Sequence, residues 1–408
     1  MNLTIATIAK QINASFEGDA SLLIDAISID SRSLQNGSHT LFFALIGPNN
    51  DAHSYIIDLI QQGVTHFVVQ YIPEDCVGKA QFLVVQNTLA ALQELASYHR
   101  SLFHFPVIGV TGSNGKTIVK EWLNFLLSPD YSIIRSPKSY NSRVGVPLSV
   151  LAIAKQHNFG IFEAGISTVN EMGYLEKIIQ PTLGILTNIG SAHDEGFSSI
   201  GEKIKEKLQL FKHCDLLIYN KNKTIDAFLK PTLKTFSWSF KDATADVFIQ
   251  KSSILDKTKL HIQLESYAFD IIIPFQDDAS IENAIHCLMV LLHLGYDRVT
   301  IEHRMYLLYP VEMRLKVKDG INSTTIIDDS YSSDFQSLKI ALDFLESQKQ
   351  HQKKTVVLSD IFQSGLSNEV LYSKVAELII SNNISRFIGI GETISTLETK
   401  LPNAIFFK

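Results

Sequence analysis

The chain has 408 residues, of which 45% are hydrophobic and 19% are charged, with 42 acidic against 36 basic side chains. This composition is typical of a globular protein of two or three domains, and its mild negative charge argues against non-specific binding to nucleic acid. The three cysteines form no Cys-x-x-Cys pair, so neither a disulfide framework nor a cysteine-based zinc site is predicted. The sequence shows neither a secretory signal nor an apolar run long enough for stable membrane insertion, so we expect a cytoplasmic protein.

Short strands and helices alternate along the chain. Residues 41–47 and 65–70 are predicted strands, and residues 54–63 are a predicted helix that ends at a glycine. From residue 104, apolar strands at 158–165, 182–190 and 214–220 are separated by helical stretches. This pattern predicts an α/β fold with a mostly parallel sheet that is covered on both faces.

The later part of the chain continues this alternation. Residues 241–270 are predicted to add an antiparallel edge, and residues 280–295 to form a buried helix. Beyond Pro310, strands are expected around 323–331, 354–360 and 385–391, and a strand-like end at 403–408. We therefore predict three domains, at residues 1–103, 104–309 and 310–408.

The stretch "FPVIGVTGSNGKTIVKEWLNFLL", residues 105–127, reads as a strand, a glycine-rich loop and an amphipathic helix. Gly112 and Gly115 allow the backbone to approach a ligand, and the helix N-terminus favours an anion. Lys116 supplies a charge to phosphates, and Thr117 an oxygen for Mg²⁺. The stretch therefore predicts a nucleotide-phosphate loop, although the usual pattern has a glycine where Val110 stands. A glycine-rich turn without a ligand is the alternative.

Further candidates follow other strands. Glu163 ends one apolar strand, Asn188 and His193 follow another, and the carboxyl edge of a parallel sheet suits a metal site. Taken alone, Glu163 would be interpreted as a solvated acid at a strand end, and His193 as a solvated loop histidine. Lys207 lies in "GEKIKEKLQLF", which on its own indicates a charged helix face.

"GVTGSNGKT" resembles the ATP loop of the Mur ligases, the ATP-dependent amide-forming enzymes of peptidoglycan synthesis. Their loop has the form T-G-x-N-G-K-T, so Val110 is expected, and Ile118 is the one departure. The resemblance implies a three-domain fold with a central P-loop ATPase domain and a C-terminal Rossmann-like domain. It also implies that Ser113 and Asn114 bind ATP with the rest of the loop.

The same resemblance assigns the metal site. It implies that Thr117, Glu163 and His193 help to hold Mg²⁺, as a pair of ions. It further implies that Lys207, by its offset from His193, is carbamylated and becomes a metal ligand. Lys205 is the competing lysine.

The central and third domains have further matching segments. The resemblance implies nucleotide contacts from three of them. These are Asn283 in "SIENAIHC", Arg314 in "PVEMRLKV" and Asp329 in "IIDDSYSSDFQSL". In the last segment Ser332 and Asp334 replace two asparagines of the family, which puts direct contacts from them in doubt. Phe335 replaces a proline.

The N-terminal segment resembles the uridine-nucleotide domain of two branches of the family. The residues implied to face the UDP-sugar are Ser31, Arg32, Asn49, Asn50 and Asp51. "SPKSYNSRVGVPLSVL" resembles the branch that adds D-alanyl-D-alanine, with Asn141 retained and Ser142 in place of a second asparagine. "VLSDIFQSG" resembles the form fused to an alanine racemase, so we expect a ligase part whose third domain is shortened.

The resemblance implies ATP-dependent addition of D-alanyl-D-alanine to a UDP-N-acetylmuramoyl-tripeptide through an acyl phosphate. Lys116, Lys207, His193 and Glu163 are the implied catalytic residues. The alternatives are the branch that adds the third amino acid, a folate-polyglutamate ligase, a regulatory nucleotide switch and a non-catalytic nucleotide-binding remnant.

Overall fold

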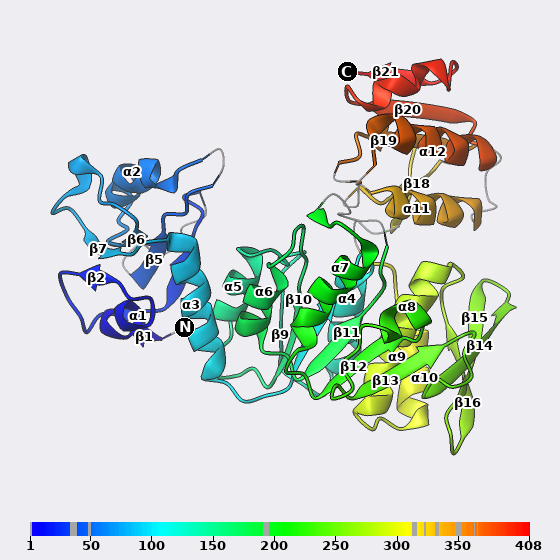
Figure 1. Ribbon diagram of the computed structural model, residues 1–408, viewed down its shortest axis with the longest axis horizontal. Coiled ribbons are helices and arrows are strands. Elements are labelled where there is room, and N and C mark those ends of the chain that lie inside the picture. Colours follow the sequence, from blue (N-terminus) through cyan, green and yellow to red (C-terminus); the bar gives the residue numbers. More distant parts are fainter. Residues whose placement is uncertain are drawn as a thin grey trace. The chain divides into compact units, whose positions relative to one another are not determined.

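The computed structural model describes residues 2–32, 39–47, 50–190, 196–311, 316–321, 324–330, 334–347, 353–362, 364 and 366–408. The chain packs as two compact units. The first comprises Met1–Val107, Tyr131–Ala164 and Gly173–Pro181, and the second Ile108–Asp130, Gly165–Met172 and Thr182–Lys408. Helices and strands alternate in both units, which confirms the predicted α/β class (Figure 1). The domain boundaries at residues 103 and 309 stay predictions.

A five-stranded sheet with the order β2-β7-β6-β5-β4 forms the N-terminal part of the first unit. Strands β4 to β7 run parallel, and β2 pairs antiparallel with β7. β5 and β6 are buried at every position, so their sequences do not alternate between polar and apolar residues. The bounds are β2 Ser15–Phe16, β4 Ala26–Ser28, β5 Thr40–Phe43, β6 His66–Val69 and β7 Gln81–Val84.

The helices of this part surround the sheet (Figure 1). The predicted helix at 54–63 begins as a 3-10 turn capped by Asp51 and ends before Gly63, whose φ is +91°. Its buried face packs on Phe42 and Phe67. The bounds are α1 Ile5–Gln11, η2 Ala52–Tyr55, α2 Ile56–Gln61, η3 Glu74–Cys76 and α3 Thr88–Ser101, with a strand pair of β1 Leu3–Thr4 and β3 Leu23–Ile24.

The rest of the first unit contains the parallel pair β9 (Ile133–Arg135) and β10 (Phe159–Glu163). Helix α5 (Gly145–Leu151) packs against α3, and helix α6 spans Met172–Ile179. Arg100 at the end of α3 is buried, and its guanidinium donates to the carbonyl oxygens of Phe103, Ile179 and Gln180. These three hydrogen bonds compensate for the burial of the guanidinium charge, which would otherwise destabilise the fold.

In the second unit, strands β16-β15-β14-β13-β12-β11-β8 are neighbours in this order. β8 and β11 to β14 run parallel, whereas β14 to β16 are antiparallel, which confirms the edge addition predicted between residues 241 and 270. The bounds are β8 Val107–Thr111, β11 Leu183–Leu186, β12 Leu216–Asn220, β13 Thr235–Ser239, β14 Val247–Ile254, β15 Lys257–Gln263 and β16 Ala268–Ile273.

Helix α9, predicted as buried at 280–295, is buried along most of its length and packs against α4. Trp122 of α4 stacks on Phe275 with ring centroids 4.7 Å apart, and its indole N–H donates to the carbonyl oxygen of Tyr309 at 2.7 Å. The helices of this part are α4 Lys116–Leu127, α7 Ile200–Leu208, η5 Gln209–Phe211, α8 Lys223–Asp226, α9 Asp278–His293 and α10 Arg298–Tyr306.

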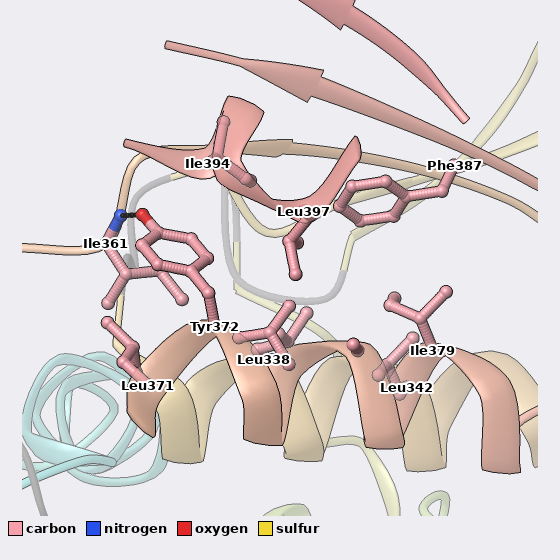
Figure 2. Packing of buried hydrophobic residues seen from close by; sticks show 11 residues of the cluster. Leu338, Leu342, Ile361, Leu371, Tyr372, Ile379, Phe387, Ile394 and Leu397 are labelled. Carbon is pink, nitrogen blue, oxygen red and sulfur yellow. Dashed lines mark hydrogen bonds between the residues drawn. The ribbon is translucent and has the colours of Figure 1, made fainter. Parts of the chain in front are cut away.

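The C-terminal residues form a parallel sheet with the order β19-β20-β21 and a separate antiparallel pair of β17 and β18. Figure 2 shows the core between this sheet and helices α11 and α12, where the Ile361 N–H donates to the Tyr372 hydroxyl at 3.1 Å. The bounds are β17 Lys316–Asp319, β18 Thr325–Asp328, α11 Phe335–Ser347, β19 Thr355–Ser359, α12 Asn368–Ser381, β20 Arg386–Ile390, η6 Ile394–Thr399 and β21 Ile405–Phe407.

Alternate residues of this parallel sheet point away from the two helices. Val357, Ile390 and Phe407 are 60%, 47% and 57% exposed.

Among the described residues, no helix combines the length and the apolar character that are needed to cross a membrane.

Candidate functional site

The predicted phosphate loop connects β8 to α4 in the second unit, which confirms the strand, loop and helix expected over residues 105–127. Gly112 has a φ of +149° and Gly115 a φ of +85°. A Cβ atom on Gly112 would lie 1.9 Å from Oγ1 of Thr187, and one on Gly115 would lie 2.2 Å from Oδ1 of Asn283. Both positions therefore require glycine for backbone conformation and for space.

Helix α4 begins at Lys116, directly after the loop. The residue at its N-cap is Gly115, so no side chain caps this end, and a helix N-terminus attracts an anion. The Nζ of Lys116 donates to the carbonyl oxygens of Gly112 and Ser113, each at 2.9 Å. The amine therefore lies folded over the loop, within reach of an anion that the loop would hold.

The segment after β11 supports the loop through several hydrogen bonds. The N–H of Asn114 donates to Oδ1 of Asn188 at 3.0 Å, and the N–H of Ser113 donates to the Asn188 carbonyl at 2.9 Å. The Ser113 hydroxyl accepts from the Gly190 N–H at 2.8 Å, and the Thr187 hydroxyl donates to the Asn114 carbonyl at 2.6 Å. Asn188 thus lies beside the loop, where the sequence predicts it.

Two lysines of α7 are buried beside this structure. Lys203 and Lys207 are spaced i,i+4 and are 1% and 2% exposed. Nζ of Lys207 donates to the Gly112 carbonyl at 3.0 Å, and Nζ of Lys203 to the Gly190 carbonyl at 2.6 Å. Burial, together with the charges of Lys116 and Lys203, lowers the pKa of Lys207 well below its ordinary 10.5. The neutral amine of Lys207 is therefore favoured.

A cavity of about 420 Å³ adjoins the loop within the second unit. Its walls come from the loop with the segment after β11, from the start of α9, and from the segment of β18 and α11. The polar residues that line it are Asn114, Asn188, Asp277, Asp278, Ser280, Glu282, Asn283, Asp329, Ser337, Lys339 and Asp343. The structure therefore brings two predicted nucleotide contacts, Asn283 and Asp329, to the same cavity as the loop.

Asn114 contributes a buried hydrogen-bond donor to this cavity. Its Nδ2 atom has no hydrogen-bond partner within the described ranges. The Ser337 hydroxyl lies 3.3 Å from Oδ1 of Asn114 and 2.5 Å from Oδ2 of Asp334. Because Nδ2 is a hydrogen-bond donor, a ligand oxygen or nitrogen with a lone pair would satisfy it.

Glu163 ends β10 in the first unit and is fully buried. Its backbone N–H donates to the Ser136 hydroxyl at 3.2 Å. A buried carboxylate at the carboxyl end of a parallel strand has the chemistry of a ligand for Mg²⁺. Among the described residues, no group of three or more His, Cys, Asp and Glu side chains gathers as a metal site. The predicted ligand His193 lies outside the described residues, as do the predicted contacts Asn49 and Arg314.

The predicted UDP-sugar residues lie in the first unit. Ser31 is half-buried, and Arg32 is exposed with its guanidinium bonded to the Asp30 carboxylate at 2.9 Å. Asn50 accepts from the hydroxyl of Tyr55 at 2.9 Å, and Asn141 is half-buried. Arg32 therefore has an accessible cation, as a contact to an anionic ligand requires.

The Asp51 carboxylate has a structural role in this unit. Its Oδ1 accepts from the backbone N–H of His53 at 2.9 Å and faces Nδ1 of His53 at 2.6 Å, and its Oδ2 accepts from the hydroxyl of Tyr71 at 2.7 Å. Despite partial burial, these bonds lower the pKa of Asp51. Both carboxylate oxygens thus have protein partners.

Sequence reasoning missed the buried Lys203, the Thr187 hydroxyl, His286 and Ser337. The i,i+4 spacing of Lys203 and Lys207 on the same face as Leu210 was the available signal for the first. Ser142, which replaces a family asparagine, accepts from the Gly145 N–H at 3.1 Å and so helps to start α5. Asp334, which replaces another, accepts from the Ser337 N–H at 3.0 Å at the start of α11.

A strand, a glycine-requiring loop and an uncapped helix with Lys116 define a P-loop nucleotide-binding protein. Residues 110–291 match the Mur ligase middle domain, and the similarity to curated Mur ligases runs along nearly the whole chain. The chain therefore resembles the Mur ligases both within and beyond this middle domain.

Three relatives illustrate this similarity. The UDP-N-acetylmuramoyl-tripeptide--D-alanyl-D-alanine ligase of Rickettsia prowazekii is 28% identical over 94% of this chain and 86% of its own length. A crystal structure of MurF from Acinetobacter baumannii matches with a TM-score of 0.87 and 22% identity, over 100% of this chain and 90% of that one. The MurF ligase of Thermotoga maritima, solved in complex with ADP, matches with a TM-score of 0.77 and 21% identity, over 93% and 87%. The two structures show that the fold is that of a Mur ligase.

Proposed function

We propose that this protein is an ATP-dependent ligase that joins D-alanyl-D-alanine to a UDP-N-acetylmuramoyl-tripeptide in the cytoplasm. The observation that carries the proposal is the phosphate loop with the buried Lys207 against its Gly112 carbonyl, in a chain similar over 94% of its length to a ligase of that name. The cavity beside the loop supplies space for the rest of a nucleotide.

The proposed reaction has two steps. An oxygen of the tripeptide carboxylate attacks the γ-phosphorus of ATP, the bond to the bridging oxygen breaks, and ADP leaves. The dipeptide amine then attacks the carbonyl carbon of the acyl phosphate, loses a proton, and inorganic phosphate leaves. The residues of this chain that act on the phosphoryl group are the loop amides and Lys116, whose amine lies over the loop.

Mg²⁺ fits the donor set of this proposal. Thr117 in the first turn of α4 and the buried carboxylate of Glu163 are oxygen donors of the kind that Mg²⁺ takes, and we assign His193 as a further ligand. Bound Mg²⁺ would offset negative charge on the phosphoryl oxygens. The lowered pKa of the buried Lys207 suits carbamylation, because the neutral amine is the form that adds CO₂.

The remaining assignments are also proposals. Asn283 and Asp329 line the cavity and are proposed nucleotide contacts, together with Arg314. Ser31, Arg32, Asn49, Asn50, Asp51 and Asn141 are the proposed contacts to the UDP-sugar. Fusion to an alanine racemase also stays a proposal, which the mass of the native polypeptide tests.

Phosphate release from ATP tests the function. We expect release that requires both UDP-N-acetylmuramoyl-tripeptide and D-alanyl-D-alanine, and a K116M variant that is inactive. Release that is stimulated instead by UDP-N-acetylmuramoyl-dipeptide and a third amino acid would point to the other branch of the family. Release that ignores both acceptor and amine would exclude a ligase.

A further inference from the structure

One buried histidine of α9 lies outside the roles described so far. His286 is fully buried, and its neighbours along the helix, Ile285, Cys287 and Leu288, are apolar core residues. Burying an imidazole among such residues costs free energy unless both ring nitrogens have hydrogen-bond partners. Both nitrogens of His286 do have partners, and this sets it apart from the surrounding core.

The two partners fix the state of the ring. The indole N–H of Trp238 in β13 donates to Nδ1 of His286 at 3.3 Å, so Nδ1 carries no proton. Nε2 therefore carries the proton and donates it to the carbonyl oxygen of Thr187 at 3.0 Å. Burial lowers the pKa of His286 to about 4, so the ring is neutral at physiological pH.

Thr187 transmits this contact to the phosphate loop. Its backbone N–H donates to the Thr111 carbonyl at 2.9 Å, and its hydroxyl donates to the Asn114 carbonyl at 2.6 Å. The same hydroxyl occupies the space that a side chain on Gly112 would need. The position of the Thr187 peptide therefore sets the position of the loop from Thr111 to Asn114.

We infer that His286 is a positioning residue for nucleotide binding, which holds the Thr187 peptide and through it the phosphate loop in its binding conformation. The inference rests on the proposed function, since it concerns the same nucleotide site. His286 does not line the cavity, so it acts through Thr187 and not by contact with the nucleotide.

The chain offers a matched control in His99. This histidine is also buried, at 3% exposure, and its Nε2 bonds the Ile153 carbonyl at 2.9 Å, but it lies in α3 of the first unit. H286L and H99L each remove one buried imidazole and one bond to a carbonyl, whereas H286Q keeps an N–H group that reaches the Thr187 carbonyl.

The experiment measures ADP affinity by calorimetry on the full chain, with thermal unfolding of each variant in parallel. We expect H286L to weaken ADP binding about tenfold, H286Q to stay within about threefold of the wild type, and H99L to lose thermal stability without a change in affinity. W238F, which removes the donor to Nδ1 but keeps an aromatic ring, should weaken ADP binding about threefold and serves if H286L does not fold.

Two outcomes separate the inference from the proposed function. Wild-type affinity in H286L, or in W238F where H286L does not fold, would overturn the positioning role and leave the ligase proposal standing. Tight ADP binding by the wild type without acceptor-dependent phosphate release would overturn the ligase proposal, while the affinity ratios would still decide the role of His286.

Discussion

The side-chain amine of Lys207 donates to the backbone carbonyl of Gly112 at 3.0 Å, so a buried lysine contacts the first glycine of the phosphate loop. Nζ of Lys116 donates to the same carbonyl. Two lysines therefore meet at one acceptor, where burial lowers the pKa of Lys207 and the charge of Lys116 lowers it further.

This relationship predicts a pH-dependent stability difference. The folded-state pKa of Lys207 lies below its unfolded value, so between the two values the unfolded chain binds more protons. The wild type should therefore gain stability relative to K207M as the pH rises toward 10.5. Urea unfolding of both proteins across that range, in CO₂-free buffer, measures the difference. K205M is the control, because Lys205 lies on the exposed side of the same helix. A difference in unfolding free energy between wild type and K207M that does not change with pH would contradict the prediction.

The close contact of Gly115 with Asn283 predicts a specific loss in G115A. The substitution strains a backbone with φ +85° and places a Cβ 2.2 Å from Oδ1 of Asn283. We expect a loss of about 1–3 kcal/mol in unfolding free energy and an ADP affinity lowered more than about tenfold. Gly295 has φ +76° and open space around its missing Cβ, so G295A shares the strain without the contact. Equal ADP affinities of G115A and G295A would refute the role of Gly115 in nucleotide binding.

The Ser337 hydroxyl of α11 donates to Asp334 in the same turn and lies 3.3 Å from Oδ1 of Asn114 in the phosphate loop. S337A should raise KM for ATP about two- to fivefold with little change in Tm, because it removes contacts at the cavity and not core packing. S381A removes a comparable hydroxyl bond, to Leu378 near the end of α12, and should leave KM unchanged. Initial rates at varied ATP concentrations give KM for each variant. An unchanged KM in S337A would show that the Ser337 hydroxyl is dispensable for ATP binding.

Arg32, one of the proposed UDP-sugar contacts, has a side chain that is 86% exposed. Because an exposed ion pair contributes little to stability, R32A should keep the wild-type Tm. Affinity for the UDP-linked substrate should fall about tenfold if the guanidinium binds its diphosphate. R298A is the control, since Arg298 forms a similar exposed pair with Glu302 in the second unit. Matching substrate affinities in the two variants would remove Arg32 from the site.

The phosphate loop could be predicted because its determinants are local. The apolar strand, Gly112, Gly115 and the stripe of Val119 and Trp122 lie within a single stretch, and each specifies its own backbone conformation or burial. The sheet was predictable for the same reason, because buried parallel strands are recognisable as short apolar runs.

His286 could not be predicted in this way, since its burial depends on contacts distant in sequence. His286 meets Trp238 and Thr187, which lie 48 and 99 residues away in the chain. Asp334 shows a related difficulty. Its replacement of an asparagine suggested a lost contact, yet its carboxylate bonds Ser337, and this bond depends on the turn that starts α11.

The two tryptophans of the chain, Trp122 and Trp238, both belong to the second unit and are almost fully buried. Indole fluorescence therefore reports on the nucleotide-binding unit alone, because the first unit contains no tryptophan. Trp238 donates a hydrogen bond to His286, whose other ring nitrogen donates to the Thr187 carbonyl. The emission of Trp238 therefore reports on the surroundings of the residue that holds the Thr187 peptide.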